Sequence, residues 1–298
     1  MGGRRVAVLD QADARVAPRA RIVDEGGLWS FELHGRPNAD VVLVLLPAMG
    51  VPARYYDPFV EELLRCDVAV VRADFLAERV IRDPSRPLDG FAALVEGCIP
   101  VIFETLKTWE PEATPAIVGH SLGGQLGLVA AARFAPEIAL VLVASGSAWH
   151  RVFGGARRWL YRGGSQAIHG IARMLGYWPG HVMGFGGRQP LALVRDWSGV
   201  VRTGHYQAAT GTFDYGASLH RYRGDVLAID VVGDVLAPLA AKDALLAKAP
   251  AAHVDRHSYV GARGSAKPGA HFTWVRDRSD LASVIVSWVR TRQPPAAT

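Results

Sequence analysis

Short, nearly continuous apolar runs place the strongest constraint on the fold of this chain. They lack the alternation of apolar and polar residues that marks a strand with one exposed face. Runs of this kind are typical of strands buried on both faces, as in a parallel sheet that is covered by helices. The runs span residues 41–46, 68–72, 116–118, 139–143 and 226–232.

Helical patterns separate these runs, because apolar residues recur there every three or four positions. An earlier segment, 28–33, alternates with period two and predicts a leading antiparallel strand. Alternating strands and helices favour an α/β fold in which a mostly parallel central sheet is flanked by helices. Pro100 is expected to end or kink the second helix. The helical patterns cover residues 55–64, 91–98, 122–134, 239–249 and 281–289.

The composition is that of a globular protein. Hydrophobic residues make up 50% of the 298 residues and charged residues 20%, which excludes a disordered or collagen-like chain. The two cysteines, Cys66 and Cys98, lie in apolar segments, so a disulfide framework is excluded. The longest apolar stretch, residues 41–49, falls short of the roughly 18 residues of a membrane-spanning helix. We therefore expect a soluble, cytoplasmic protein without a transmembrane segment.

The alternation breaks once, between His150 and Arg223. This segment contains 14 glycines, several aromatic residues, and ten arginines against two acidic residues, Asp196 and Asp214. It carries a net charge of +8, whereas the whole chain carries +5 and the remainder −3. Because the strand pattern resumes at Val226, residues 150–223 are interpreted as an inserted cap on a core formed by residues 1–149 and 224–298.

The candidate nucleophile follows one of the buried runs. Residues 116–124 read Ala-Ile-Val-Gly-His-Ser-Leu-Gly-Gly, which combines a short strand, a Gly-x-Ser-x-Gly motif and the start of a helical pattern. This context predicts a nucleophile elbow, a sharp turn that exposes the hydroxyl of Ser121. Gly119 and Gly123 are expected to leave room where side chains would collide. His120 cannot easily fold back onto that hydroxyl and is interpreted as structural.

With these features the chain resembles the α/β-hydrolase superfamily over nearly all of its length. It is most similar to the predicted hydrolases of the serine-aminopeptidase-like and monoglyceride-lipase-like branch. Further similarities to little-characterised bacterial hydrolases are the segment Leu46–Val51, the residues Arg54-Tyr55-Tyr56 and the cap residues around Trp178 and Trp197. The resemblance implies a catalytic triad in the chain order serine, acid, histidine.

The acid is sought in the loop after the run 226–232. There Asp234 precedes Pro238 by four residues, as in the corresponding loop of the family, and is the candidate acid. Its role would be to orient the histidine and stabilise the imidazolium. Asp230 is the main competitor but lies inside the strand run, and Asp225 lies at the opposite end of that run.

His271 is the candidate base. It lies between the last strand candidate, residues 253–260, and the closing helix, which is where the family places its histidine. It would take the proton of Ser121 and return it to the leaving group. His257 is the alternative, but it belongs to the strand pattern.

Two backbone N–H groups are needed for an oxyanion hole. Leu122, directly after the nucleophile, is expected to provide one of them. The other is expected from the loop after the run 41–46, where Pro47 has no N–H and Met49 is the aligned position. A second departure from the family is residues 74–77, which read Asp-Phe-Leu-Ala where many relatives have Asp-x-Arg-Gly.

These residues predict a serine hydrolase that cleaves a carboxylic ester or thioester through an acyl-enzyme intermediate. The arginine-rich, aromatic cap suits a small-molecule substrate with an apolar acyl chain and an anionic portion. An acyltransferase with the same triad and a non-catalytic hydrolase-fold binding protein remain alternatives. No motif for nucleic acid, metal or nucleotide binding is present, so no nucleic-acid partner, metal or cofactor is expected. The oligomeric state is left open.

Overall fold

The computed structural model describes residues 18–24, 29–75, 90–207, 213–261, 269–277 and 280–292, together with the backbone of residues 4–8. Nine strands of this described chain form one sheet in the order β1-β2-β3-β5-β4-β6-β7-β10-β11. The first three strands pair antiparallel, β3 is antiparallel to β5, and all later neighbours are parallel. The strands are β1 (Arg4–Val8), β2 (Ala20–Asp24), β3 (Ser30–His34), β4 (Val41–Leu46), β5 (Ala69–Asp74), β6 (Thr114–His120), β7 (Ala139–Val143), β10 (Asp225–Val231) and β11 (His253–Tyr259).

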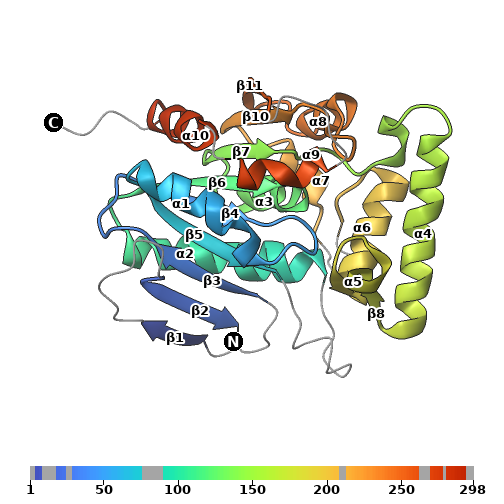
Figure 1. The fold of residues 1–298 in the computed structure, drawn as a ribbon, viewed down its shortest axis with the longest axis horizontal. Helices are drawn as coiled ribbons and strands as arrows, with labels where there is room; N and C mark the ends of the chain where they lie inside the picture. The colour runs from blue at the N-terminus through green and yellow to red at the C-terminus, as the bar shows by residue number, and fades with distance from the viewer. Residues whose placement is uncertain are drawn as a thin grey trace.

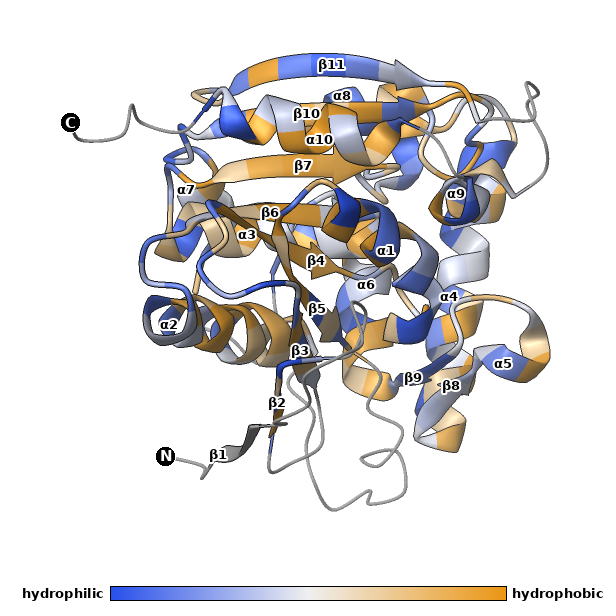
Figure 2. Ribbon diagram, turned by 60° about the vertical axis from the view of Figure 1, so that its left-hand side comes forward, coloured by the Kyte–Doolittle hydropathy of each residue, from blue (hydrophilic) through white to orange (hydrophobic). Residues whose placement is uncertain are grey.

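Helices cover both faces of this sheet, as Figures 1 and 2 show. Alternate side chains of β4 enter two separate cores. Val42 and Val44 pack with α2 and α3, whereas Leu43 and Leu45 pack with α1 and α10. The helices of the core are α1 (Asp57–Arg65), α2 (Ile99–Trp109), α3 (Leu122–Phe134), α7 (Tyr215–Leu219), α8 (Leu239–Leu246), α9 (Ala270–Thr273) and α10 (Leu281–Arg290).

Of the two effects expected of Pro100, ending or kinking the helix, the first does not occur. A π-helix at Ala93–Cys98 passes directly into α2, which begins at Ile99 with the proline in its first turn. A proline is tolerated there because the N–H groups of the first turn have no partner within the helix. The proline therefore lies at a change of helix type, and the chain continues as the α-helix α2 as far as Trp109.

The segment between β7 and β10 holds a group of elements that lies beside the sheet, at the right of Figure 1. The long helix α4 (Arg157–Leu175) packs against α6 (Leu191–Thr203) and the strand β8 (Tyr177–Pro179). The helix α5 (Gly180–Met183) and the strand β9 (Arg188–Pro190), which pairs with β8, complete the group. By contrast, α7 packs against α3 in the helical layer of the sheet. None of the described helices is both long and apolar enough to cross a membrane.

Candidate active site

Ser121 occupies the sharp turn between β6 and α3. Its backbone has φ 52° and ψ −116°, in the left-handed region that a residue with a side chain rarely adopts. The turn is held by a hydrogen bond from the N–H of Ser121 to the carbonyl of Val143, the last residue of β7, at 3.1 Å. The N–H groups of Gly124 and Gln125 donate to the carbonyl of Ser121 at 3.1 and 3.2 Å.

Two glycines make this turn sterically possible. A Cβ atom at Gly119 would lie 2.3 Å from the Cα of Gly124, and one at Gly123 would lie 2.3 Å from the carbonyl oxygen of Leu46. Neither backbone can move aside without displacing a strand or the helix. The expectation that these glycines leave room at the elbow is therefore confirmed.

Asp234 and His271 come together from distant parts of the sequence. The Oδ2 atom of Asp234 lies 2.8 Å from the Nδ1 atom of His271, and both residues are buried. Asp234 follows β10. His271 is the second residue of α9, and this helix begins directly after Gly269, which has a φ of 101°. Since the imidazole donates from Nδ1, its Nε2 atom is free to act as a base.

The turn around Asp234 fixes its carboxylate. The other oxygen, Oδ1, accepts hydrogen bonds from the N–H groups of Leu236 at 2.8 Å and Ala237 at 3.0 Å. Burial by itself raises the pKa of Asp234, but the hydrogen bond and charge of His271 and the two N–H donors outweigh it, so the pKa lies below its ordinary value. Asp234 is therefore ionised at neutral pH.

Ser121 and His271 line one cavity of about 70 Å³. Its floor comes from the core, including the loop that carries Met49 and the first turn of α3 with Leu122. Its opposite wall comes from the elements between β7 and β10. Four residues of the segment 150–223 line it, namely Tyr161, Phe185, Gly186 and Trp197. The ring of Phe185 lies 5.8 Å from that of Trp197, and burial raises the pKa of Tyr161 to about 12.

Within the described chain, two N–H groups of the loop after β4, those of Met49 and Gly50, donate to no other group, and of these two residues only Met49 lines the cavity. Pro47 has no N–H, and the N–H of Ala48 donates to the hydroxyl of Tyr56 at 2.8 Å. Within the described chain, neither Met49 nor Leu122 donates its N–H to another group. Both residues line the cavity beside Ser121. Their N–H groups are thus available as the pair that an oxyanion hole requires.

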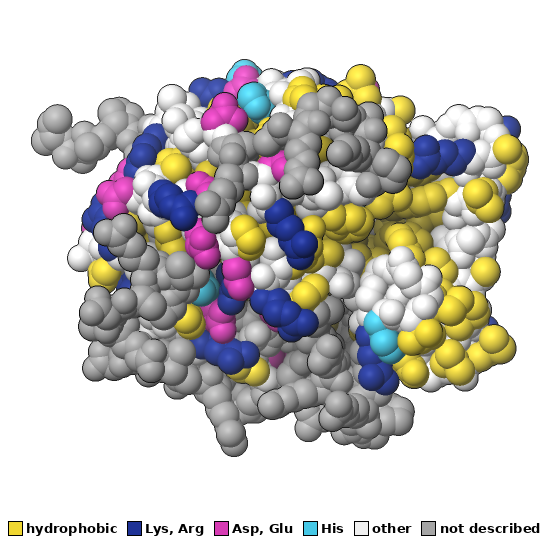
Figure 3. Space-filling model, in the orientation of Figure 1, with side chains coloured by type: hydrophobic (Ala, Val, Ile, Leu, Met, Phe, Trp, Pro, Cys, Tyr) yellow, Lys and Arg dark blue, Asp and Glu magenta, His cyan; other side chains and the backbone are white. Residues whose placement is uncertain are grey.

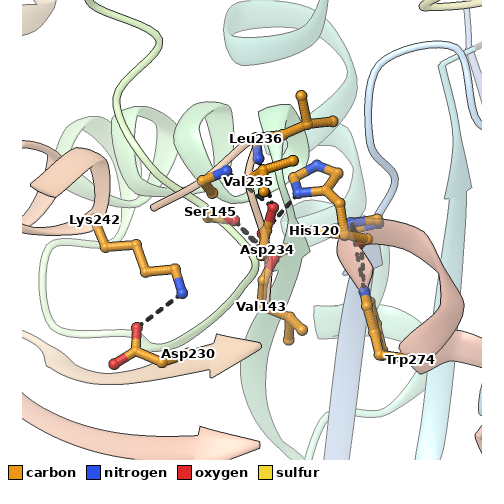
Figure 4. A network of polar contacts seen from close by, with 12 residues as sticks. His120, Val143, Ser145, Asp230, Asp234, Val235, Leu236, Lys242 and Trp274 are labelled. Carbon is orange, nitrogen blue, oxygen red and sulfur yellow. Dashed lines mark hydrogen bonds and ion pairs between the residues drawn. The ribbon is translucent and has the colours of Figure 1, made fainter. Parts of the chain in front are cut away.

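His120 lies at the centre of a buried hydrogen-bond network, part of which appears in Figure 4. Its Nδ1 atom lies 2.8 Å from the hydroxyl of Tyr56, and its Nε2 atom lies 2.8 Å from the carbonyl oxygen of His271. Burial and the neighbouring His271 lower the pKa of His120 well below its ordinary value, so the ring is neutral. The carbonyl of His271 can only accept, so Nε2 donates to it, and the unprotonated Nδ1 of the neutral ring accepts from the hydroxyl of Tyr56.

Tyr56 and His120 therefore join three parts of the candidate site: the loop of Met49, the elbow of Ser121 and the backbone of His271. Tyr55 adds a second link, because its hydroxyl donates to the carbonyl of Phe272 at 2.8 Å. The sequence predicts a structural role for His120 but gives no sign of the roles of the two tyrosine hydroxyls. The adjacent residues Tyr55 and Tyr56 were visible as a motif, but nothing local showed what their hydroxyls contact.

The elements between β7 and β10 touch the loop of Met49 through backbone atoms. A Cβ atom at Gly50 would lie 1.9 Å from the carbonyl oxygen of Gly186, and one at Gly187 would lie 2.7 Å from the carbonyl oxygen of Gly50. All three glycines have a positive φ. The two backbones can approach this closely only because no side chain separates them.

The competing acidic residues have other partners. Asp230 lies 3.0 Å from the ammonium of Lys242, as Figure 4 shows, and Asp225 lies 3.2 Å from His253. His257 is held within β11, where it is opposite Ile229. Neither aspartate pairs with His271 in the described chain, and only Asp234 does.

Other predicted features lie away from this cavity. No arginine is among the described residues that line it. A larger groove of about 390 Å³ lies near the amino ends of β4 and β6, between α2 and the end of α3, and holds no serine or histidine. Among the described residues, no group of three or more histidine, cysteine, aspartate or glutamate side chains could hold a metal ion. Residues 76 and 77 of the divergent loop lie outside the described residues.

Several solved protein structures have a fold similar to that of this chain. No protein-family model and no curated protein match the sequence. Among solved structures, Est1E from Butyrivibrio proteoclasticus is similar with a TM-score of 0.54 and 15% identity, over 91% of this chain and 98% of that one. The esterase EaEST from Exiguobacterium antarcticum has a TM-score of 0.55 and 12% identity, over 88% and 96% of the two chains.

A third similar structure is Est816, described as an N-acyl homoserine lactone degrading enzyme. Its TM-score is 0.52 at 14% identity, with 89% of this chain and 99% of that chain covered. The strand order, the elbow between β6 and α3 and these likenesses define the class: the chain has the α/β-hydrolase fold, as the sequence predicts.

Proposed function

We propose that this protein is a serine hydrolase that cleaves a carboxylic ester or thioester. Ser121 is the nucleophile, His271 the general base and acid, and Asp234 the residue that orients the histidine. The observation that carries the proposal is that Ser121, on its strained elbow, and His271, paired with the buried Asp234, line the same cavity. The esterases with a similar fold agree with cleavage of an acyl bond.

The proposed reaction has two halves. In the first, His271 Nε2 takes the proton of Ser121 as the hydroxyl oxygen attacks the carbonyl carbon, and the N–H groups of Met49 and Leu122 bind the oxyanion. The imidazolium then gives its proton to the leaving alcohol or thiol, which leaves an acyl-enzyme. In the second half, His271 activates a water molecule that releases the acid. Asp234 stays ionised throughout and stabilises the imidazolium.

We further propose that residues 150–223 act as a cap over this reaction. Tyr161, Phe185 and Trp197 of this segment would surround the acyl group of the substrate. The cavity of about 70 Å³ is far below the ~300–1,000 Å³ that is typical for drug-sized ligands, which favours a short acyl group.

Labelling with a fluorophosphonate probe tests the nucleophile. The wild-type protein is expected to be labelled at Ser121, and the Ser121→Ala and His271→Ala variants are expected not to react. Ser147→Ala is the matched control, because Ser147 lines the same cavity but does not occupy the elbow. Labelling that persists in Ser121→Ala, or a folded wild-type protein that does not react, would contradict the proposed mechanism.

A series of p-nitrophenyl esters then separates hydrolysis from acyl transfer. Release of free acid at the same rate as p-nitrophenol is expected for a hydrolase, whatever alcohol or amine is added. An increase in acylated acceptor at the expense of free acid would instead show an acyltransferase with the same nucleophile.

A further inference from the structure

The outer surface of α4 and α5 exposes large apolar side chains. Six such residues are more than half exposed, and we call them the α4–α5 surface: Trp159 (56%), Leu160 (76%), Met174 (78%), Leu175 (53%), Val182 (76%) and Met183 (57%). Figure 3 shows apolar side chains gathered on the side of the molecule that these elements form. Contiguous exposed apolar patches on soluble proteins mark sites of interaction.

The exposed face of α4 is continuous along the helix. Leu160, Ala167 and Met174 recur every seven residues and therefore lie on one side of it. Gly163, Gly164 and Gly170 are exposed between them, and a Cβ atom added at any of the three would meet no atom within 4 Å. No described element of the chain covers this face.

The exposed charged side chains of the segment that contains α4 and α5 are all positive. Residues 150–207 contain eight arginines and a single acidic residue, Asp196. The carboxylate of Asp196 is fully buried and accepts a hydrogen bond from the N–H of Phe91 at 2.9 Å. The segment therefore exposes arginines and no carboxylate. The exposed arginines are Arg151, Arg157, Arg158, Arg162, Arg173 and Arg202.

We propose that the α4–α5 surface docks onto an anionic lipid membrane. Apolar side chains next to arginines suit the boundary between acyl chains and headgroups, because arginine reaches the phosphates while its stem stays in apolar surroundings. Trp159 has the amphipathic ring that favours this boundary, and Arg158 and Arg162 lie 5.0 and 5.9 Å from it. A second copy of the chain is disfavoured as the partner, since it would bring arginines against arginines.

Co-sedimentation of the full-length protein with vesicles tests this proposal. We expect binding to vesicles of phosphatidylcholine mixed with phosphatidylglycerol, weaker binding at high salt, and little binding to phosphatidylcholine alone. Arg162→Gln and Arg173→Gln should each weaken binding about fivefold. The double variant Leu160→Ser with Met174→Ser should weaken it at least about tenfold.

Matched controls keep the test specific to this surface. Val260→Ser removes an apolar side chain that is 59% exposed at the end of β11, and Arg65→Gln removes an exposed arginine of α1. Both controls should bind as the wild type does. On binding, tryptophan emission should shift to shorter wavelength, and Trp159→Phe should remove most of that shift.

Three outcomes would overturn the proposal, and none depends on enzymatic activity. The first is the absence of binding to anionic vesicles by a folded wild-type protein, and the second is a loss of binding in the control variants that equals the loss in the surface variants. The third is a dimer in light scattering that Leu160→Ser with Met174→Ser converts to a monomer, because the surface would then be covered by a second copy.

Discussion

Tyr56 connects the candidate oxyanion loop to the candidate base through His120. Its hydroxyl accepts from the N–H of Ala48 and donates to His120, which in turn donates to the carbonyl of His271. Every group in this network is buried, so each lost hydrogen bond leaves a donor or acceptor without water to replace it. Tyr56 is thus a positioning residue for both Met49 and His271.

Tyr56→Phe should lower both stability and turnover. The free energy of unfolding should fall by about 2 kcal/mol, because the N–H of Ala48 and the Nδ1 atom of His120 lose their partner. If Met49 binds the oxyanion, kcat should fall on the order of tenfold with little change in KM, since that contact forms in the transition state. Urea unfolding and steady-state kinetics measure the two effects.

Tyr222→Phe is the matched control for this substitution. Tyr222 is also buried and donates its hydroxyl to a backbone carbonyl, that of Ile138 at 2.7 Å, far from the cavity. It should lose stability and keep its kcat. A similar loss of stability in both variants with an unchanged kcat in Tyr56→Phe would show that Tyr56 supports only the fold.

Asp234→Asn should abolish most activity while the protein stays folded. An amide cannot stabilise the imidazolium and favours the wrong tautomer of His271, so kcat should fall about 10³–10⁴-fold. Asp230→Asn provides the comparison, because Asp230 pairs with Lys242 outside the cavity. Equal losses of kcat in both variants would remove Asp234 from the mechanism.

The residues of the candidate site differ in how visible they are in the sequence. Ser121 is marked by its local pattern, because a strand, two glycines and a helix must be adjacent to form the elbow. Asp234 and His271 have no such local pattern and are predicted only from the strands that they follow. In the structure the Oδ2 atom of Asp234 lies 2.8 Å from the Nδ1 atom of His271. The role of Tyr56 depends on a contact with His120, which is 64 positions away in the sequence. The spacing of the neighbouring apolar residues therefore predicts only that Tyr56 lies on the apolar face of a helix.

At the scale of elements, an ion pair joins β3 to the parallel part of the sheet. Glu32 of β3 lies opposite Arg72 of β5, and the two side chains form an ion pair at 2.5 Å. Hydrogen bonds from His34 and Arg72 and the charge of Arg72 lower the pKa of Glu32 to about 2, although burial opposes them. Its folded-state pKa is thus below the ordinary value of 4.5.

The stability that Glu32 contributes should depend on pH. Because its pKa is lowered by folding, the contribution is fully present above about pH 4.5 and is lost as the pH falls toward 2. Glu32→Gln should therefore cost about 1–2 kcal/mol at neutral pH and progressively less in acid. Urea unfolding across this range measures the difference, with the exposed Glu104→Gln as a control that should change little. A cost that is independent of pH would exclude the ion pair as its source.

Elements were most predictable where burial on both faces left no polar residue in a strand. The runs 41–46 and 139–143 coincide with β4 and β7, and the helical pattern 122–134 coincides with α3. The short strands β8 and β9 have three residues each and carry no such signal. At Pro100 the rule that proline ends a helix was outweighed by its place in the first turn of α2.

For the whole molecule, the cavity depends on two segments that are far apart in the sequence. The loop of Met49 and Gly50 meets the turn at Gly186 and Gly187, and these backbones are in contact. Composition predicted an arginine-rich cap but not the direction of its side chains. In the structure many of these arginines are exposed to solvent, and the segment 150–223 contributes the aromatic residues Tyr161, Phe185 and Trp197 to the cavity wall.

Phe185→Ala should extend the range of acyl chains that the proposed enzyme accepts. The wild type is expected to prefer p-nitrophenyl acetate and butyrate, with kcat/KM falling by about tenfold or more for each step to a longer chain that the cavity cannot hold. Removing the ring of Phe185 frees space beside Trp197 and should move the decline to longer esters.

Phe103→Ala is the control for this change, because Phe103 lines the larger groove near the amino ends of the strands. It removes a ring of the same size and should leave the chain-length profile unchanged. If both variants keep the wild-type profile while remaining active, the aromatic wall does not limit the acyl group. The length preference would then originate in the core part of the cavity, around Gln125 and Ser147, which the proposed cap does not supply.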